Sequence, residues 1–243
     1  MIDRDVLWTL AGSLIDTWGW LIPFLLMLPG LSLLRHLRRT RQRGQEGETQ
    51  VGRALERLFP AVAHDVILPS GRSGLTQIDH IALTRKGLLV VETKHYRGLI
   101  TGRVEDPRWI QRIGRQRHDF QNPLRQNDTH VRAVRALGLG VPVLERVVFT
   151  DAAQFPDGLP EGVSALATLA DDLKPWRGGR VSAALKAAWS QFLSQTRQDR
   201  AARRAHRRGL RQRHGRDPRL VKALVWFGLA VIAALALSFQ RFD

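Results

Sequence analysis

The stretch from Gln77 to Lys94, QIDHIALTRKGLLVVETK, limits the possible folds of this chain most strongly. Apolar residues lie on both sides of the turn sequence Arg85-Lys86-Gly87, so the stretch predicts a β-hairpin. Its second strand begins with four apolar residues in a row, as expected of a strand that is buried on both faces. Three charged residues are nevertheless set into this hairpin: Asp79, Glu92 and Lys94.

The register of the hairpin decides whether these three charges meet. If Arg85-Lys86 is the centre of the turn, Asp79 lies opposite Glu92, and if Lys86-Gly87 is the centre, Asp79 lies opposite Lys94. In both registers the three side chains project from one face, because side chains alternate and opposed residues share a face. A three-residue turn would place Asp79 on the other face. Two carboxylates and an ammonium on one patch bind a divalent cation and polarise a phosphate; the alternative is a solvated face with cross-strand ion pairs.

Two predicted helices flank the hairpin. The first runs from Glu46 to Phe59, and Glu48 projects toward its apolar face as a candidate site carboxylate. The helix dipole favours an acid in the first turn in any case, which is the alternative explanation for Glu48. Asn122-Pro123 predicts the start of the second helix. Gln126 follows near this N-terminus, where free N–H groups attract an anion such as a phosphate.

Three other features have structural alternatives. His80 is expected to point away from the face of Asp79, as a hydrogen-bonded structural histidine and not a ligand. The arginine-rich stretch from Trp109 to Phe120 predicts either a surface that contacts phosphates and stacks a base, or a solvated basic loop anchored in the core by its aromatic ends. Residues 181–213 predict one long helix, apolar on one side only in its first half.

Two uncharged segments, Trp18 to Leu34 and Ala223 to Phe239, approach the length that spans a bilayer of about 30 Å. A basic tract adjoins each segment on the side of the central region. Residues 35–43 hold five arginines, and residues 197–222 hold ten arginines and one lysine against two aspartates. Because positive charge is retained in the cytoplasm, this pattern predicts two spans in the inner (cytoplasmic) membrane, with the central domain cytoplasmic and both termini outside. The net charge of +16 therefore belongs mainly to these flanks.

The sequence resembles the NERD (nuclease-related) domain, a branch of the PD-(D/E)xK nuclease superfamily, over residues 44–152. The matching residues are Gly47-Glu48, QIDH at Gln77 to His80, ETK at Glu92 to Lys94, Gly98 with Gly102, Trp109, and NPLRQN at Asn122 to Asn127. The resemblance implies an α/β fold with a restriction-endonuclease-like αβββαβ core, in which helices flank a mixed central sheet, and a metal-dependent phosphodiesterase site.

Carried over by position, the resemblance makes Asp79 and Glu92 metal ligands, Lys94 the catalytic lysine, Glu48 the first-helix carboxylate and Gln126 an auxiliary group. Oxygen ligands in a chain with no cysteine favour one or two Mg²⁺ or Mn²⁺ ions over zinc, held by Asp79 and Glu92 and by Glu48 through water.

Together these observations predict four segments and one function. The segments are a transmembrane helix (about 17–34) with a basic tract in 1–43, a nuclease-like domain in 44–180, a basic helix or linker in 181–222, and a second transmembrane helix in 223–243. The expected function is a membrane-anchored nuclease that hydrolyses nucleic acid, with DNA as the expected substrate. The alternative is a nucleic-acid-binding or scaffold module, tethered to the membrane, that does not cut.

Overall fold

The computed structural model describes residue 13 and residues 18–71, 74–150, 152–196 and 217–239. The chain divides into two compact units, residues 1–42 with 214–243 and residues 43–213. Helix α2 (Leu21–Leu58) contributes to both units.

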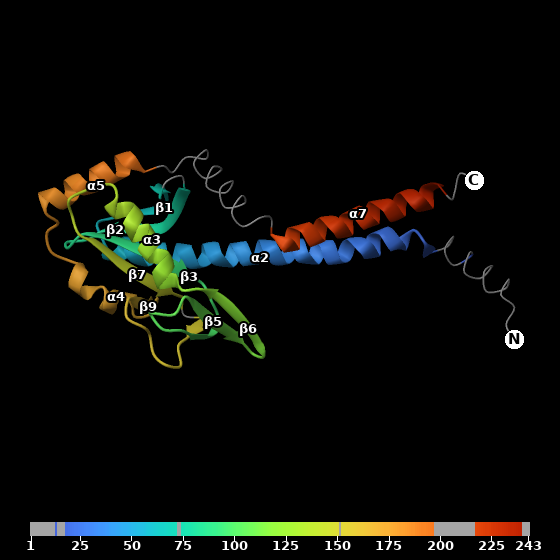
Figure 1. Cartoon of the computed structure of the whole chain (residues 1–243), viewed down its shortest axis with the longest axis horizontal. Helices are drawn as coiled ribbons and strands as arrows, with labels where there is room; N and C mark the ends of the chain where they lie inside the picture. The colour runs from blue at the N-terminus through green and yellow to red at the C-terminus, as the bar shows by residue number, and fades with distance from the viewer. Residues whose placement is uncertain (1–12, 14–17, 72–73, 151, 197–216, 240–243) are drawn as a thin grey trace. The chain divides into compact units, whose positions relative to one another are not determined.

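The larger unit is built on a five-stranded sheet in the order β1-β2-β3-β7-β9 (Figure 1). The strands are β1 (Ala61–Ser70), β2 (Gly74–Leu83), β3 (Leu88–Lys94), β7 (Val143–Phe149) and β9 (Val163–Ala165). The first three strands pair antiparallel, while β3, β7 and β9 pair parallel, so the sheet is mixed. With helix α3 (Pro123–Arg135) between β3 and β7, the order α2-β1-β2-β3-α3-β7 confirms the predicted restriction-endonuclease-like αβββαβ core.

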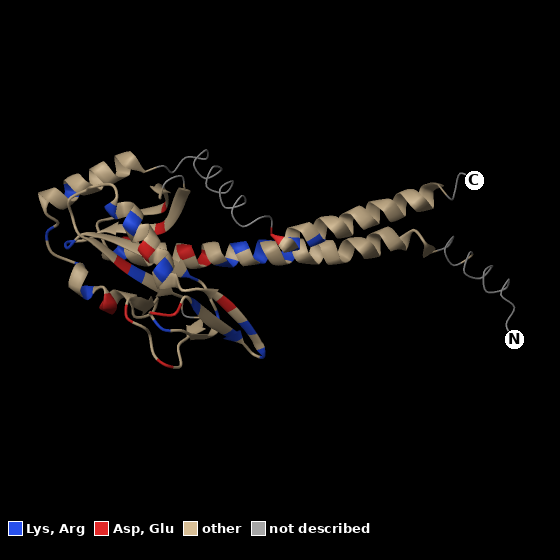
Figure 2. Cartoon of the chain, in the orientation of Figure 1, with Lys and Arg blue, Asp and Glu red and all other residues tan. Residues whose placement is uncertain are grey.

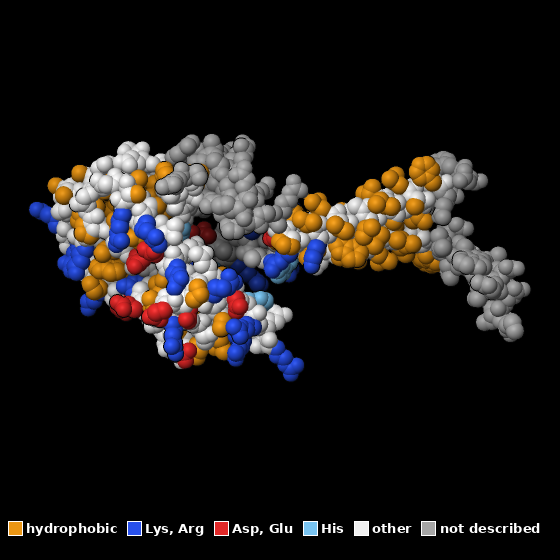
Figure 3. Space-filling view, in the orientation of Figure 1, with side chains coloured by type: hydrophobic (Ala, Val, Ile, Leu, Met, Phe, Trp, Pro, Cys, Tyr) orange, Lys and Arg blue, Asp and Glu red, His pale blue; other side chains and the backbone are white. Residues whose placement is uncertain are grey.

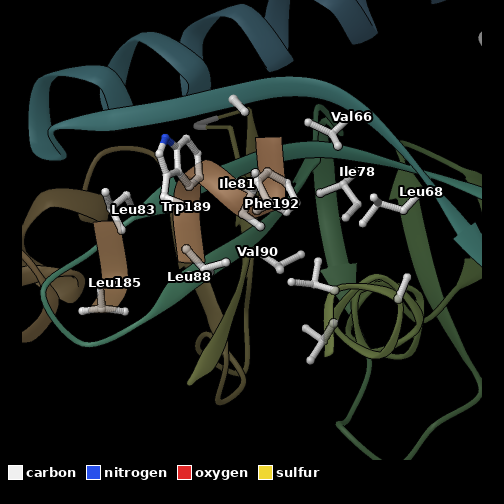
Figure 4. Packing of buried hydrophobic residues seen from close by; sticks show 14 residues of the cluster. Val66, Leu68, Ile78, Ile81, Leu83, Leu88, Val90, Leu185, Trp189 and Phe192 are labelled. Atoms are coloured by element: carbon white, nitrogen blue, oxygen red, sulfur yellow. The ribbon is translucent and has the colours of Figure 1, made fainter. Parts of the chain in front are cut away.

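Helices cover both faces of this sheet. On one face, α3 and α5 (Ala183–Gln195) pack on β1, β2 and β3 through an apolar cluster in which Val90 lies near Phe192 (Figure 4). On the other face, the C-terminal part of α2 packs through Val51 and Leu55 against a second cluster. Leu169 of α4 (Leu169–Asp172) joins this cluster, and the short helix η1 (Lys174–Trp176) follows. The sheet is therefore buried on both faces, as the apolar run in β3 predicted.

A second sheet of four strands, in the order β6-β5-β4-β8, is inserted mainly between β3 and α3. Its strands are β4 (Gly98–Thr101), β5 (Arg108–Ile113), β6 (Gln116–Gln121) and β8 (Ala153–Gln154). The arginine-rich stretch is thus a hairpin and not a loop. Trp109 is 0% exposed and stacks on Phe149, with ring centroids 6.2 Å apart. The prediction that this stretch stacks a base through Trp109 is therefore wrong, and its anchoring in the core is confirmed.

Two helices differ in length from the sequence prediction. The segment expected to begin a new helix at Glu46 continues α2 without a break, because no proline lies between Pro29 and Pro60 and the stretch is rich in arginine, glutamine and glutamate, which favour helix. Helix α5 ends at Gln195, and Thr196 is extended, so one helix does not span 181–213. Residues 197–213, the remainder of that predicted helix, lie outside the described residues.

The smaller unit pairs the apolar part of α2 with α7 (Pro218–Phe239). A Cβ on Gly30 would lie 3.1 Å from the ring of Phe227, so the glycine permits close contact between the two helices. Only 6% of the apolar window of α2 and 11% of that of α7 is buried, and apolar side chains cover the visible surface of both helices (Figure 3). By length and composition both helices are able to cross a membrane, and they are not buried core helices.

Gly47 sets how closely α2 approaches the sheet. A Cβ at Gly47 would lie 2.5 Å from Cβ of His95, whereas one at Gly44 of the same helix would meet nothing within 4 Å. We expect Gly47→Ala to lower the free energy of unfolding by about 1–3 kcal/mol through overpacking. Gly44→Ala should raise it by about 1 kcal/mol through helix propensity. Chemical unfolding followed by circular dichroism measures both changes, and effects of the same sign in the two variants would contradict the close approach.

Candidate active site

The hairpin β2–β3 has the first of the two expected registers. Leu83 pairs with Leu88, and the backbone N–H of Thr84 donates to Gly87 O at 3.0 Å, so Arg85-Lys86 is the centre of the turn. This register sets Asp79 opposite Glu92. The ladder between the two strands extends only as far as the pair His80–Val91, whereas β3 stays paired with β7 up to Lys94. The strands β2 and β3 therefore part where the charged residues begin.

Asp79 occupies this opening. Its Oδ2 accepts a hydrogen bond from the backbone N–H of Thr93 at 2.9 Å, in place of a strand partner. The regular alternation of β2 is also interrupted here, since Ile78 and Ile81 belong to the same apolar cluster although they are three residues apart. On β1, the neighbouring Asp65 has φ 53°, the only positive value of a non-glycine residue among those described. Asp79 thus lies at a local break in the sheet and not on a simple strand face.

Glu92 and Lys94 form a buried ion pair directed toward α3. Lys94 Nζ donates to Glu92 Oε1 at 2.6 Å and to Gln126 Oε1 at 2.9 Å. The other oxygen of Glu92, Oε2, lies 3.1 Å from Nε2 of His130, one turn after Gln126. Nδ1 of His130 lies 2.8 Å from the hydroxyl of Thr76, so the network continues across the sheet to β2. Glu92 is 3% exposed, and both of its oxygens are held.

Helix α2 brings Glu48 to the same region. Glu48 and Asp79 line one cavity of about 540 Å³, a size usual for ligand sites. The lining residues are Gln45, Glu48, Thr49, Gly52, Arg53, Glu56, His64, Asp65, Asp79 and His80. The structure thus brings together all five predicted site residues, with Glu92, Lys94 and Gln126 on the α3 side and Glu48 and Asp79 toward α2.

Burial and neighbouring charges shift the pKa values of the four ionisable site residues. Burial raises the pKa of Asp79 well above its usual range, and the charge of Glu92 raises it further, while the Thr93 N–H lowers it in part. Burial, Asp65 and Glu92 likewise raise the pKa of Glu48. Burial alone would raise the pKa of Glu92, but Lys94 and His130 hold it below its usual value. Burial alone would lower the pKa of Lys94, but Glu92 keeps it above its ordinary value. Burial is therefore the main cause that raises the pKa of Asp79 and of Glu48, and neighbouring carboxylates add to it.

The donor chemistry of this site fits a hard divalent cation. Asp79 and Glu48 line the cavity, and carboxylate oxygens are the ligands that such a cation prefers. Among the residues that the structure describes, however, no three His, Cys, Asp or Glu side chains are grouped to hold a metal ion. Lys94 and His130 each contact one oxygen of Glu92, so a metal ion would have to use the remaining lone pairs of these oxygens.

Sequence reasoning identified the charged residues but assigned no role to two of their partners. His130 lies four residues after Gln126 on α3, so helical spacing alone places both on one face. No local sequence pattern pointed to Thr76, because the hydrogen bond between Thr76 and His130 joins residues 54 positions apart in the chain. Asn127, between them on α3, donates to the backbone carbonyls of Val90 and Arg146 and has a structural role.

The fold and this charged group define a nuclease-like α/β domain. The family model of NERD, the nuclease-related domain, matches residues 43–150, so the chain contains a nuclease-related domain. This class is consistent with nucleic acid as a partner and suggests the use of divalent metal ions.

An uncharacterised protein of Bacillus anthracis is 42% identical to the chain over 98 residues. The aligned part covers 39% of this chain and 46% of that protein, so the match spans less than half of either. No solved structure is significantly similar to the chain.

His80 contacts a second histidine, as expected of a structural residue, but it also lines the cavity of Asp79 and is not directed away from it. Its Nδ1 lies 2.8 Å from Nδ1 of His64, whose Nε2 lies 3.1 Å from Glu56 Oε1. Burial and the neighbouring His64 lower the pKa of His80 to about 4. The unfolded chain, with an ordinary histidine pKa of about 6.5, therefore binds a proton before the folded chain does.

This difference makes stability depend on pH in a defined direction. The free energy of unfolding should fall as the pH decreases from about 6.5 to about 4, by up to about 3 kcal/mol from His80 alone. His80→Asn retains a donor toward His64 and removes the titration, so its stability should fall less over this range. Urea unfolding at pH 7, 5.5 and 4 tests the prediction, and identical losses in the two proteins would refute it.

Proposed function

We propose that the chain is a membrane-anchored, metal-dependent phosphodiesterase that acts on nucleic acid, with DNA as the expected form. The observation that carries the proposal is the buried pair of Glu92 and Lys94, which α3 holds next to the opening occupied by Asp79. Burial of an ion pair is costly and is common where chemistry requires fixed charges.

Lys94 is the group proposed to meet the substrate phosphate. An ammonium has three N–H donors, and Glu92 and Gln126 accept two of them. Among the described residues no third acceptor is bound to Lys94, which leaves one N–H to donate to a phosphate oxygen or to the attacking water. Gln126 accepts from Lys94 through its oxygen, so its amide N–H groups are left to donate toward the same phosphate. His130 contacts the second oxygen of Glu92 and so fixes the carboxylate. The carboxylate in turn fixes the direction of the Lys94 side chain.

Asp79 and Glu48, with Glu92, are the proposed holders of one or two Mg²⁺ or Mn²⁺ ions. When bound, the metal would neutralise phosphate charge and lower the pKa of its water. The position of Asp79 and Glu48 on one cavity supports this assignment, because two carboxyl groups close together offer a divalent cation oxygen ligands.

A second candidate function is binding without cleavage. Two observations favour it: both oxygens of Glu92 are already hydrogen-bonded, and no group of three metal-ligand side chains exists among the described residues. Such a protein would bind nucleic acid or act as a scaffold at the membrane with a site that does not cut.

Cleavage assays on the full-length protein in neutral detergent separate these candidates. Lys94→Met should reduce the rate of plasmid cleavage in Mg²⁺ or Mn²⁺ at least about 100-fold, because a fixed donor to the transition state is lost. Asp79→Asn should abolish stimulation by the metal. Lys86→Met is the matched control, since Lys86 is exposed in the turn at the other end of the same hairpin. Binding without cleavage, unaffected by EDTA or by Lys94→Met, would favour the binding module.

The two apolar helices support the proposed anchoring in the inner membrane, with the larger unit in the cytoplasm. The chain has no cysteine, so single cysteines report topology cleanly. In intact cells, an impermeant maleimide should label a cysteine appended after Asp243, but should label Arg115→Cys only after permeabilisation. The reverse pattern, or release of the protein by alkaline carbonate, would overturn the proposed topology.

A further inference from the structure

The hairpin of β5 and β6, residues 108–121 and here called the basic hairpin, has an unfavourable charge arrangement. Arg112 of β5 pairs directly with Arg117 of β6, and Arg115 lies in the turn between them. All three residues are exposed. Like charges directly opposite each other destabilise an antiparallel pair, so folding alone does not account for this arrangement.

The charges of the basic hairpin are poorly compensated within the chain. Asp119 is the only acid in residues 108–121, against four arginines. It lies 3.4 Å from Nε of Arg117, with both side chains about half-exposed, and an ion pair of this kind contributes little. Arg112 and Arg115 make no ion pair among the described residues. Figure 2 shows the resulting basic tip of the hairpin, which projects from the second sheet.

The base of the basic hairpin is fixed beside the candidate active site. Phe120 packs edge-on against Tyr96, two residues after Lys94, with ring centroids 4.7 Å apart. Trp109 stacks on Phe149, which is the strand partner of Lys94. The chain then passes directly from β6 into α3, which carries Gln126. The exposed arginines therefore stand on an arm whose root is next to Lys94.

We propose that the basic hairpin is an arm that contacts the phosphate backbone of double-stranded nucleic acid bound at the candidate active site. This inference rests on the proposed function. A duplex fits better than a single strand, because single-strand recognition depends on exposed aromatic rings, and Trp109 and Phe120 of this hairpin face the protein interior. A two-stranded ribbon is also of a size that the major groove of DNA admits.

The test replaces Arg112, Arg115 and Arg117 together by glutamine in the full-length protein. The matched control replaces Arg135, Lys174 and Arg180, which are exposed elsewhere in the same unit, and changes the net charge equally. Binding of a 30-base-pair DNA duplex is measured by fluorescence anisotropy in Ca²⁺ from 50 to 200 mM salt. The rate of hydrolysis of bis(p-nitrophenyl) phosphate in Mn²⁺ measures catalysis by the candidate active site alone, because this small diester is too short to reach the basic hairpin.

The hairpin variant should bind the duplex at least about tenfold more weakly at 100 mM salt, and the slope of log K against log salt should decrease by about 3. The control should stay within about threefold of the wild type. Hydrolysis of the small phosphodiester should be unchanged in the hairpin variant, which also shows that the site is intact.

Equal losses of duplex affinity in both triple variants would overturn the inference, as would a loss of affinity for single-stranded but not for duplex DNA. Loss of small-diester hydrolysis in the hairpin variant would also overturn it. So would a variant that loses binding to phosphatidylglycerol vesicles but keeps its affinity for the duplex. A different result would separate the two proposals. If the wild-type protein hydrolyses no diester but only the hairpin variant loses duplex binding, the role of the basic hairpin in DNA contact is supported and the proposed nuclease function is refuted.

Discussion

The pair of Glu92 and Lys94 is the interaction on which the rest of the larger unit depends. Two charges removed from water are tolerated only when good geometry and further hydrogen bonds offset the cost of burying them. Here α3 supplies Gln126 to the lysine and His130 to the second carboxylate oxygen, and Thr76 of β2 orients that histidine. Breaking a buried pair of this kind by removing one partner costs about 3–5 kcal/mol, so the site and the packing of α3 on the sheet are coupled.

The second requirement is that the sheet opens next to this pair. The ladder between β2 and β3 ends at His80–Val91, and Asp79 bonds to Thr93 in the opening. Gly47 lets α2 approach His95 closely, which brings Glu48 toward the same opening. The acids thus converge from two strands and a helix, and burial, followed by the charges of neighbouring carboxylates, raises the pKa values of Asp79 and Glu48.

The candidate chemistry, the substrate-contacting arm and the anchoring have separate physical bases. The chemistry depends on buried charge at Lys94, and the contact with the substrate backbone depends on exposed charge on the basic hairpin. The proposed anchoring depends on neither, because it rests on two apolar helices whose apolar windows are largely exposed. Exposed arginines screened by salt are worth little to folding, which is why their arrangement on the hairpin is informative about a partner.

The sequence by itself determined what local patterns encode: the hairpin and its two-residue turn registers, the Asn122 cap of α3 and the apolar helices. The αβββαβ order and the roles of the five candidate site residues came from the resemblance to a known family. Periodicity, turn residues and caps act between near neighbours, so they can be read from the sequence. Only the tertiary structure decided that α2 is one continuous helix, that Trp109 is buried, and that His130 and Thr76 complete the network around Glu92. It also decided that Asp79 lies in an opening and not on a strand face, because that depends on Asp65 of β1 and on where β3 leaves β2, and these contacts join residues distant in the chain.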